Sequence, residues 1–121
     1  VWATATVLFR DDRLIRWVGS QARATISTFE PVGLASIAWA FAIFCVPDKS
    51  LCGAIAAEAV SKISRLKPNE LSIILWAFAK LNALEEQLVK TAATEMATKL
   101  KTFTPQNVSN VVWALATTTA S

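Results

Sequence analysis

Four tryptophans and three prolines recur along the chain at one fixed interval of 37 residues. The tryptophans are Trp2, Trp39, Trp76 and Trp113, and the prolines are Pro31, Pro68 and Pro105. Such a period is typical of repeat proteins, in which a unit cannot bury its apolar face alone and stacks on its neighbours. The spacing therefore predicts an array of equivalent units, with these seven residues as structural markers of the repeat.

Each unit is expected to begin with a helix at its proline. Proline suits the first helical position because its missing N–H would have no partner there. With positions counted from the proline, apolar residues fill position 4 (Leu34, Leu71, Val108), position 7 (Ile37, Ile74, Val111) and position 11 (Phe41, Phe78, Leu115). We expect Phe29, Leu66 and Phe103, two residues before the prolines, to pack on position 4 as hydrophobic staples.

A second helix is expected in each unit, starting near Asp11, Asp48 and Glu85. An acidic side chain there can accept hydrogen bonds from free amides and meets the positive end of the helix dipole. Apolar residues then recur at helical spacing: Leu14, Val18, Ala22 and Ile26; Leu51, Ile55, Ala59 and Ile63; Leu88, Ala92, Met96 and Leu100. Because no stretch alternates apolar and polar residues as a half-buried strand would, the fold class is predicted to be all-α.

The predicted architecture is a right-handed α-solenoid of antiparallel helix pairs with a 37-residue repeat. Residues 1–121 form a single array, with a partial repeat at 1–30, repeats at 31–67 and 68–104, and a partial repeat at 105–121. Both ends fall inside a unit, so we expect a fragment of a longer chain. The helix that begins at Pro105 lacks its mate, and we expect more chain or a neighbour to cover it.

The orientation of the tryptophans follows from the helical rotation of about 100° per residue. Positions 4, 7, 8, 11 and 14 of the first helix form one apolar stripe that meets the second helix. Positions 2, 6, 9 and 13 fall on the opposite side, and the tryptophans occupy position 9. Each indole therefore either packs sideways on the next unit or stands on the inner surface of the array. Alanines at positions 10 and 12 allow neighbouring helices to approach closely.

The composition removes several kinds of site. The chain has no His and no Tyr, so the commonest general base and metal ligand are missing. Two cysteines without histidine make no zinc site, and we expect Cys45 and Cys52 to be buried, reduced thiols. The longest nearly apolar run, residues 33–46, is shorter than the roughly 18 to 20 residues that cross a membrane. We expect no catalysis, cofactor, metal, small-molecule substrate, membrane span or secretion.

A unit reading Pro-x-x-Leu-x-x-Ile/Val-x-Trp-Ala-Phe/Leu-Ala resembles the octotricopeptide and heptatricopeptide repeat families. The likeness is carried by Pro31, Leu34, Ile37, Trp39, Ala40, Phe41 and Ala42, by Pro68, Leu71, Ile74, Trp76, Ala77, Phe78, Ala79 and Leu81, and by Pro105, Val108, Val111, Trp113, Ala114, Leu115 and Ala116. The 37-residue interval is more similar to the heptatricopeptide variant. The first repeat departs from the pattern at Thr4 and Trp17, and the last departs at Thr117, Thr118 and Thr119. The resemblance implies an α-solenoid of mitochondria or plastids that binds RNA.

Candidate RNA contacts lie among polar residues of the first helices, since RNA-reading solenoids place a few polar side chains where each unit meets one base. The RNA-contact candidates are Asn69, Lys80, Gln106, Asn107 and Asn110, of which the asparagines could read a base edge and Lys80 could meet a phosphate. The candidates for phosphate contact are Lys62, Arg65, Lys67, Lys99 and Lys101, which equally suit helix C-termini as dipole partners. The tryptophans either stack on bases or pack between units, and packing is the more frequent role of a recurring indole.

Two functions from different classes fit these features. The first is a non-catalytic RNA-binding segment of an organellar RNA-processing, translation or ribosome-assembly factor, with single-stranded or ribosomal RNA as partner. The second is a protein-binding scaffold within a large organellar assembly such as a mitochondrial ribosome, favoured by the apolar Ile43 and Ile73 in candidate columns. The net charge of +3, from twelve basic and nine acidic residues, permits a polyanionic partner without demanding one.

Overall fold

The computed structural model describes residues 12–119, and within that range every regular element is a helix. The elements are α2 (Asp12–Thr25), η1 (Ile26–Thr28), α3 (Pro31–Ile43), α4 (Lys49–Ser61), η2 (Ile63–Arg65), α5 (Pro68–Lys80), α6 (Glu86–Thr98), η3 (Leu100–Thr102) and α7 (Pro105–Thr119). The all-α fold class is thus confirmed. Trp2 and Asp11 lie outside the described residues.

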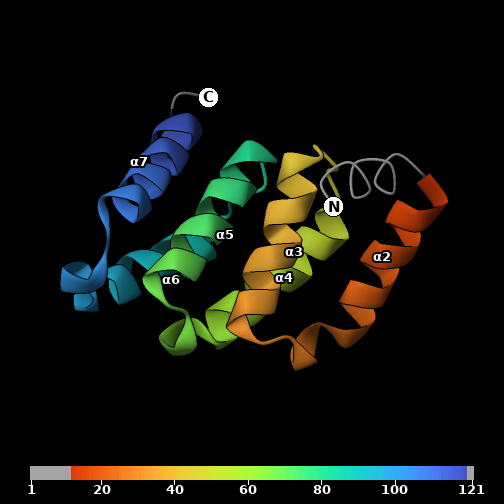
Figure 1. Cartoon of the computed structure of the whole chain (residues 1–121), viewed down its shortest axis with the longest axis horizontal. Helices are drawn as coiled ribbons and strands as arrows, with labels where there is room; N and C mark the ends of the chain where they lie inside the picture. The colour runs from red at the N-terminus through yellow and green to blue at the C-terminus, as the bar shows by residue number, and fades with distance from the viewer. Residues whose placement is uncertain (1–11, 120–121) are drawn as a thin grey trace.

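The helices form two rows. α3, α5 and α7 lie side by side and run in the same direction, and α4 and α6 form a second row behind them, which α2 continues beside α4 at the N-terminal end (Figure 1). The predicted helix starts are confirmed, because α3, α5 and α7 each begin at a proline. Each short 3-10 turn, η1, η2 and η3, ends the second helix of a unit shortly before the next proline. These turns were not foreseen.

Local signals fix the starts of these helices. Asp48 precedes α4, and its carboxylate accepts a hydrogen bond from the Leu51 N–H over 2.9 Å, as an N-cap does. At α5, the Lys67 N–H donates to Glu70 Oε1 over 2.9 Å. Glu85 precedes α6 but makes no such side-chain bond. The acidic residues therefore mark both starts, and only one of the two carboxylates caps its helix.

α3 and α5 end in the same tight turn. Cys45 and Asn82 follow their C-caps with φ values of 55° and 56°, in the left-handed region. The residue after each donates back into the helix, from Val46 N–H to the Phe41 carbonyl over 2.9 Å and from Ala83 N–H to the Phe78 carbonyl over 2.7 Å. This is the Schellman pattern that satisfies the last free carbonyls of a helix. It exposes Cys45, so the expectation that both cysteines are buried is wrong for Cys45 and confirmed for Cys52.

The core lies between the two rows and continues from unit to unit. Phe41 and Phe78 are 2% and 0% exposed, and Leu34 and Leu71 are fully buried. Alanines of positions 10 and 12 are also covered: Ala42, Ala77 and Ala114 are fully buried, and Ala79 is 6% exposed. Small side chains at the contact let α3, α5 and α7 approach closely. Burial is thus continuous along the array rather than confined within one unit.

Candidate nucleic-acid interface

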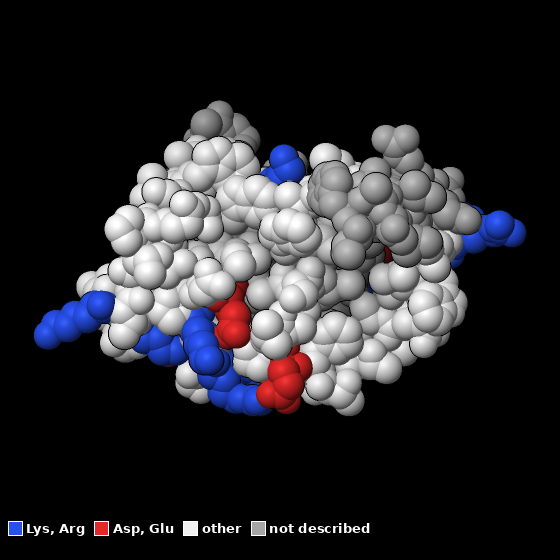
Figure 2. Space-filling view, in the orientation of Figure 1, with Lys and Arg blue, Asp and Glu red and all other residues white. Residues whose placement is uncertain are grey.

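One face of the array is formed by the sides of α3, α5 and α7 that point away from the second row. We call it the tryptophan face, and its residues are Val32, Ser36, Trp39, Asn69, Ile73, Trp76, Lys80, Gln106, Asn110 and Trp113. It faces the viewer in Figures 1 and 2. Its members come from positions 2, 6, 9 and 13, as the helical rotation predicted.

The indoles of this face are both packed and accessible. Trp39 and Trp113 are each 43% exposed, and Trp76 is half-buried. The Trp76 and Trp113 ring centroids lie 6.1 Å apart with the planes tilted by 39°. This separation falls in the range of favourable aromatic pairs. Packing between neighbouring units, one of the two alternatives for the indoles, is therefore observed for the pair of Trp76 and Trp113, while Trp39 and Trp113 also stay partly exposed.

Lys80 is the exposed cation next to this indole pair. Its Nζ lies 5.8 Å from the centroid of the Trp76 ring, within the distance of a cation–π contact. The contact holds the ammonium group over the aromatic face while the side chain stays exposed. A phosphate next to a base stacked here would meet this charge.

A groove of about 510 Å³ runs between α3 and α5 on the same face. It is lined by Val32, Ala35, Ser36, Trp39, Ala40, Asn69, Glu70 and Ile73. Apolar and aromatic walls with a few polar groups are usual for a binding groove. The groove thus places Asn69 beside the exposed ring of Trp39.

Gln106 and Asn110 continue the polar row onto α7. Gln106 Nε2 donates to Asn110 Oδ1 over 3.1 Å, one helical turn apart. Each carboxamide has two donor hydrogens and an acceptor oxygen, so one mutual bond leaves capacity for a base edge. The tryptophan face therefore carries four of the five RNA-contact candidates, namely Asn69, Lys80, Gln106 and Asn110.

Asn107 is not on this face. It is 4% exposed, and its Oδ1 accepts from the Thr104 N–H over 3.1 Å while its Nδ2 lies 3.3 Å from Ser72 Oγ on α5. Thr104 Oγ1 in turn accepts from the Asn107 N–H. Position 3 is rotated by about 100° from position 2, and this rotation turns Asn107 toward the neighbouring helix. The side-chain amide of Asn107 is therefore used to cap the start of α7.

Lys62 and Lys99 make one equivalent contact in successive units, which we call the lysine clamp. Lys62 Nζ donates to the carbonyl oxygens of Ser27 and Phe29 over 3.0 and 2.6 Å. Lys99 Nζ donates to those of Ser64 and Leu66 over 3.2 and 2.9 Å. Each ammonium group thereby bonds the last turn of the preceding unit, and the phosphate contact expected of these two lysines is left without direct support.

Glutamates complete both clamps. Glu58 pairs with Lys62 over 3.1 Å, and Glu95 pairs with Lys99 over 2.8 Å. All four side chains are at most 25% exposed. Sequence reasoning missed this role, although the motif Glu-x-x-x-Lys recurring 37 residues apart was a visible signal.

Two of the other phosphate-contact candidates, Arg65 and Lys67, line a groove with Glu30, Val32 and Glu70 at the edge of the tryptophan face. Figure 2 shows charged side chains of both signs gathered near the starts of α3 and α5, while most of the face is uncharged. Arg65 pairs with Glu30 over 2.6 Å at an exposed site. Lys67 and Lys101 are exposed. This edge therefore carries mixed charge and forms no continuous basic track.

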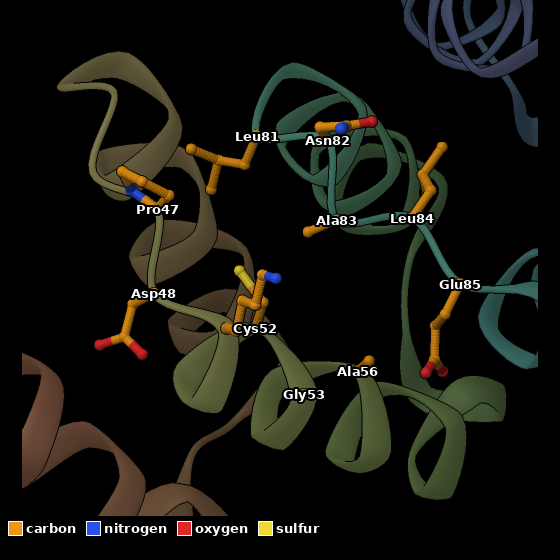
Figure 3. Close-up of a pocket in the computed structure, with 11 residues that line it drawn as sticks. Pro47, Asp48, Cys52, Gly53, Ala56, Leu81, Asn82, Ala83, Leu84 and Glu85 are labelled. Carbon is orange, nitrogen blue, oxygen red and sulfur yellow. The ribbon is translucent and has the colours of Figure 1, made fainter. Parts of the chain in front are cut away.

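A second cavity of about 290 Å³ lies between α4 and the turn that joins α5 to α6 (Figure 3). The carboxylates of Asp48 and Glu85 point away from it, while Cys52 lies on its wall. Burial raises the pKa of the Cys52 thiol. In smaller measure, a hydrogen bond with the Asp48 backbone lowers this pKa and the negative charge of the Asp48 carboxylate raises it. Within the described part of the chain, no three His, Cys, Asp or Glu residues gather as metal ligands.

None of the helices within residues 12–119 combines the length and the hydropathy needed to cross a bilayer.

Comparison with known proteins gives one family. The family model described as RNA-editing substrate-binding complex 6 protein matches residues 2–119. No curated protein and no solved structure matches the chain.

Proposed function

Because the chain belongs to the family of RNA-editing substrate-binding complex 6 proteins, we propose that it is a non-catalytic segment that binds single-stranded RNA through its tryptophan face. The family name joins RNA editing to substrate binding, which agrees with an RNA-processing factor. RNA-editing complexes of this type are mitochondrial in kinetoplastids, which agrees with an organellar location. Plastid location and a role in ribosome assembly have no support beyond the repeat resemblance.

The proposal includes the architecture. We propose a right-handed α-solenoid of 37-residue helix pairs similar to the octotricopeptide and heptatricopeptide repeats. Its support is the recurrence of equivalent interactions at that interval: the prolines that start α3, α5 and α7, the two Schellman turns, and the two lysine clamps. Independent folding units would not be expected to share such contacts across their boundaries.

The observation that carries RNA binding is the exposure of Trp39 and Trp113 on one face, each at 43%. A large aromatic ring left this open gives a base a surface on which to stack. Asn69, Gln106 and Asn110 supply hydrogen-bonding groups for base edges, and Lys80 supplies a charge for phosphate. The apolar Ile73 between them argues for stacking with limited sequence preference rather than for one base read by each unit.

A second candidate function is a scaffold that binds protein at the same face. It is favoured by Val32, which is 63% exposed beside Ile73, and by the scarcity of charge there. Protein interfaces are depleted of charge at their centres, whereas phosphate contacts require cations. The two functions differ in whether isolated RNA binds.

The test measures binding of a short fluorescein-labelled single-stranded RNA by fluorescence anisotropy. Replacement of both Trp39 and Trp113 by alanine is expected to weaken binding by about tenfold or more, because stacking contributes about 1 to 3 kcal/mol per base. The matched control is Trp17→Ala, since Trp17 is 59% exposed but lies on α2, away from the face. Equal effects of the two changes, or no RNA binding by the unaltered chain, would reject the proposal in favour of the scaffold.

A further inference from the structure

Among the described residues that line the groove between α3 and α5, Glu70 is the one that carries a charge. Glu70 is partly buried, and its Oε1 accepts the Lys67 N–H over 2.9 Å at the start of α5. Its Oε2 receives no hydrogen bond from residues 12–119. Because a carboxylate has about four acceptor positions, most of the acceptor capacity of Glu70 remains for a ligand in the groove.

The glutamate is specific to this unit. Position 3 is Gly33 in α3, Glu70 in α5 and Asn107 in α7. Asn107 meets a partner on the neighbouring helix, since its Nδ2 lies 3.3 Å from Ser72 Oγ. The residue equivalent to Ser72 on α3 is Ala35, which has no polar side-chain group and lines the groove. The Glu70 carboxylate therefore faces the groove without a polar partner across it.

Asn69 supplies a hydrogen-bond donor beside this acceptor. Its side chain lines the same groove, and its Oδ1 accepts from Asn107 Nδ2 over 3.4 Å. This bond occupies the oxygen end of the Asn69 amide and leaves both hydrogens of its Nδ2 for a ligand. The groove thus offers a donor and a negatively charged acceptor on adjacent residues of α5.

A carboxylate at an RNA-binding surface needs a specific role. It repels phosphate groups, and by itself it would weaken the binding of a polyanion. It favours binding where it accepts hydrogen bonds from the N–H groups of a base, because such bonds to a charged acceptor are strong. The bases differ in how many adjacent N–H groups they can offer to one carboxylate.

Guanine matches the groups of this groove. Its Watson–Crick edge presents the N1–H and N2–H donors side by side, followed by the O6 acceptor. The two donors fit the carboxylate of Glu70, and O6 fits Nδ2 of Asn69. Adenine and cytosine present one amino group beside an acceptor nitrogen, and uracil presents one N–H between two carbonyl oxygens. Each of these three bases would therefore place an acceptor against the carboxylate.

Trp39 provides a stacking surface in the same groove, which it lines with its ring 43% exposed. α3 and α5 run in the same direction, and position 9 lies about 9 Å further along a helix than position 3. Side chains of a helix tilt toward its N-terminus, so the indole leans from position 9 toward the level of Glu70. A base stacked on Trp39 can therefore turn its edge toward Asn69 and Glu70.

We infer that the groove between α3 and α5 is a site for one unpaired guanine of RNA. The base stacks on Trp39, its N1–H and N2–H groups donate to Glu70, and its O6 accepts from Asn69 Nδ2. This assignment rests on the proposed RNA binding and adds a base preference at one unit. The units with Gly33 and Asn107 at position 3 lack the carboxylate, so they contribute no such preference.

The test compares short fluorescein-labelled RNA strands by fluorescence anisotropy with the 121-residue chain. One strand is an oligouridine, and the second is the same strand with one central guanosine. The guanosine strand is expected to bind about tenfold more tightly, because it adds hydrogen bonds to a charged group. A third strand carries inosine, which lacks only the N2 amino group, and it should lose most of that gain.

Glu70→Gln should abolish the preference for guanosine and leave the affinity for oligouridine equal or higher, since the repulsion of phosphate is removed. Glutamine also closes a capping box, so the start of α5 is kept. The matched control is Glu86→Gln, which removes the same charge from an exposed site on α6 and should leave the preference unchanged.

Equal binding of the oligouridine and guanosine strands would overturn the guanine site and leave RNA binding intact. A preference that Glu70→Gln preserves, or an inosine strand that binds as tightly as the guanosine strand, would also overturn it. Failure of every strand to bind would reject RNA binding by the tryptophan face, and the guanine site with it.

Discussion

Lys99 Nζ donates a hydrogen bond of 2.9 Å to the carbonyl oxygen of Leu66, which belongs to the preceding unit. The contact ties a helix end to the turn that leads into α5. Lys62 makes the same contact to Phe29 one unit earlier. Stacking between units is therefore secured by directional polar bonds in addition to the apolar core. The main role of a lysine in this position is therefore to stabilise the fold rather than to add charge to the surface.

Replacing Lys99 by methionine should destabilise the fold by about 1.5 to 3 kcal/mol, since the carbonyl oxygens of Ser64 and Leu66 lose a charged donor. The measurement is urea unfolding followed by tryptophan fluorescence. Lys90→Met is the control within the same helix: Lys90 pairs with Glu86, but the two side chains are 71% and 79% exposed. Exposed pairs contribute little, and a change below about 0.5 kcal/mol is expected. Similar losses in both variants would contradict the clamp.

Asn107→Ala should destabilise the chain by about 1 to 3 kcal/mol, because Asn107 is buried and its amide serves both the start of α7 and Ser72. Asn110→Ala removes one partly exposed bond to Gln106 and should change stability by less than about 0.5 kcal/mol. Thermal unfolding by circular dichroism compares the two. RNA affinity should respond in the opposite order, with Asn110→Ala the more harmful. A variant of Asn110 that unfolds the protein would contradict this division of roles.

The difference between Asn107 and Asn110 shows which features could be predicted from the sequence and which could not. The helix starts at Pro31, Pro68 and Pro105 follow from local spacing, and the structure confirms them. The exposure of Trp39 and Trp113 also agrees with the side on which the spacing places them. The role of Asn107 depends on Ser72, a residue of another helix. Spacing within one helix cannot reveal such a partner.

The lysines illustrate the same limit. Lys62 and Lys99 resembled a phosphate track because they are cations near helix ends. Their acceptors are carbonyl oxygens that the 3-10 turns η1 and η2 bring within reach from the preceding unit. A main-chain oxygen leaves no trace in a sequence, so the acceptor could not be predicted. The donor motif Glu-x-x-x-Lys was the only part of the contact that could have been read.

Cys45→Gly should stabilise the protein by about 0.5 to 1 kcal/mol. Cys45 has a φ of 55° after α3, and a side chain in the left-handed region costs about 1 to 2 kcal/mol, partly offset by the greater backbone entropy of glycine in the unfolded chain. Cys45→Ala is the control, since it removes the thiol and keeps the Cβ. Urea unfolding should separate the two variants. A gain from alanine equal to that from glycine would rule out backbone strain as the cause.

The two thiols should react with iodoacetamide at clearly different rates at pH 8. Cys45 is exposed, whereas Cys52 is 8% exposed and burial raises its pKa. A raised pKa means less thiolate at any given pH, and the thiolate is the species that is alkylated. Mass spectrometry should show one fast and one slow addition. In the Cys45→Ala variant only the slow addition should remain, and a fast addition there would show that Cys52 is open to solvent.

RNA binding should show a shallow dependence on salt. Lys80 is the cation of the tryptophan face, and Lys62 and Lys99 are held in clamps. Each phosphate contact to a single strand contributes a slope of about −0.7 in a plot of log K against log salt concentration, so the total is expected between about −0.7 and −2.

Lys80→Gln should reduce that slope by about 0.7, whereas Lys90→Gln, on an exposed site of α6, should leave it unchanged. Anisotropy titrations between low and physiological salt supply both slopes. A slope that Lys80→Gln leaves intact would move the phosphate contacts to the charged edge, where Lys67 is exposed beside Arg65. The RNA backbone would then lie along that edge. Because phosphate contacts fix where the bases lie, stacking on Trp39 and Trp113 would then require bases that reach from that edge to the two indoles.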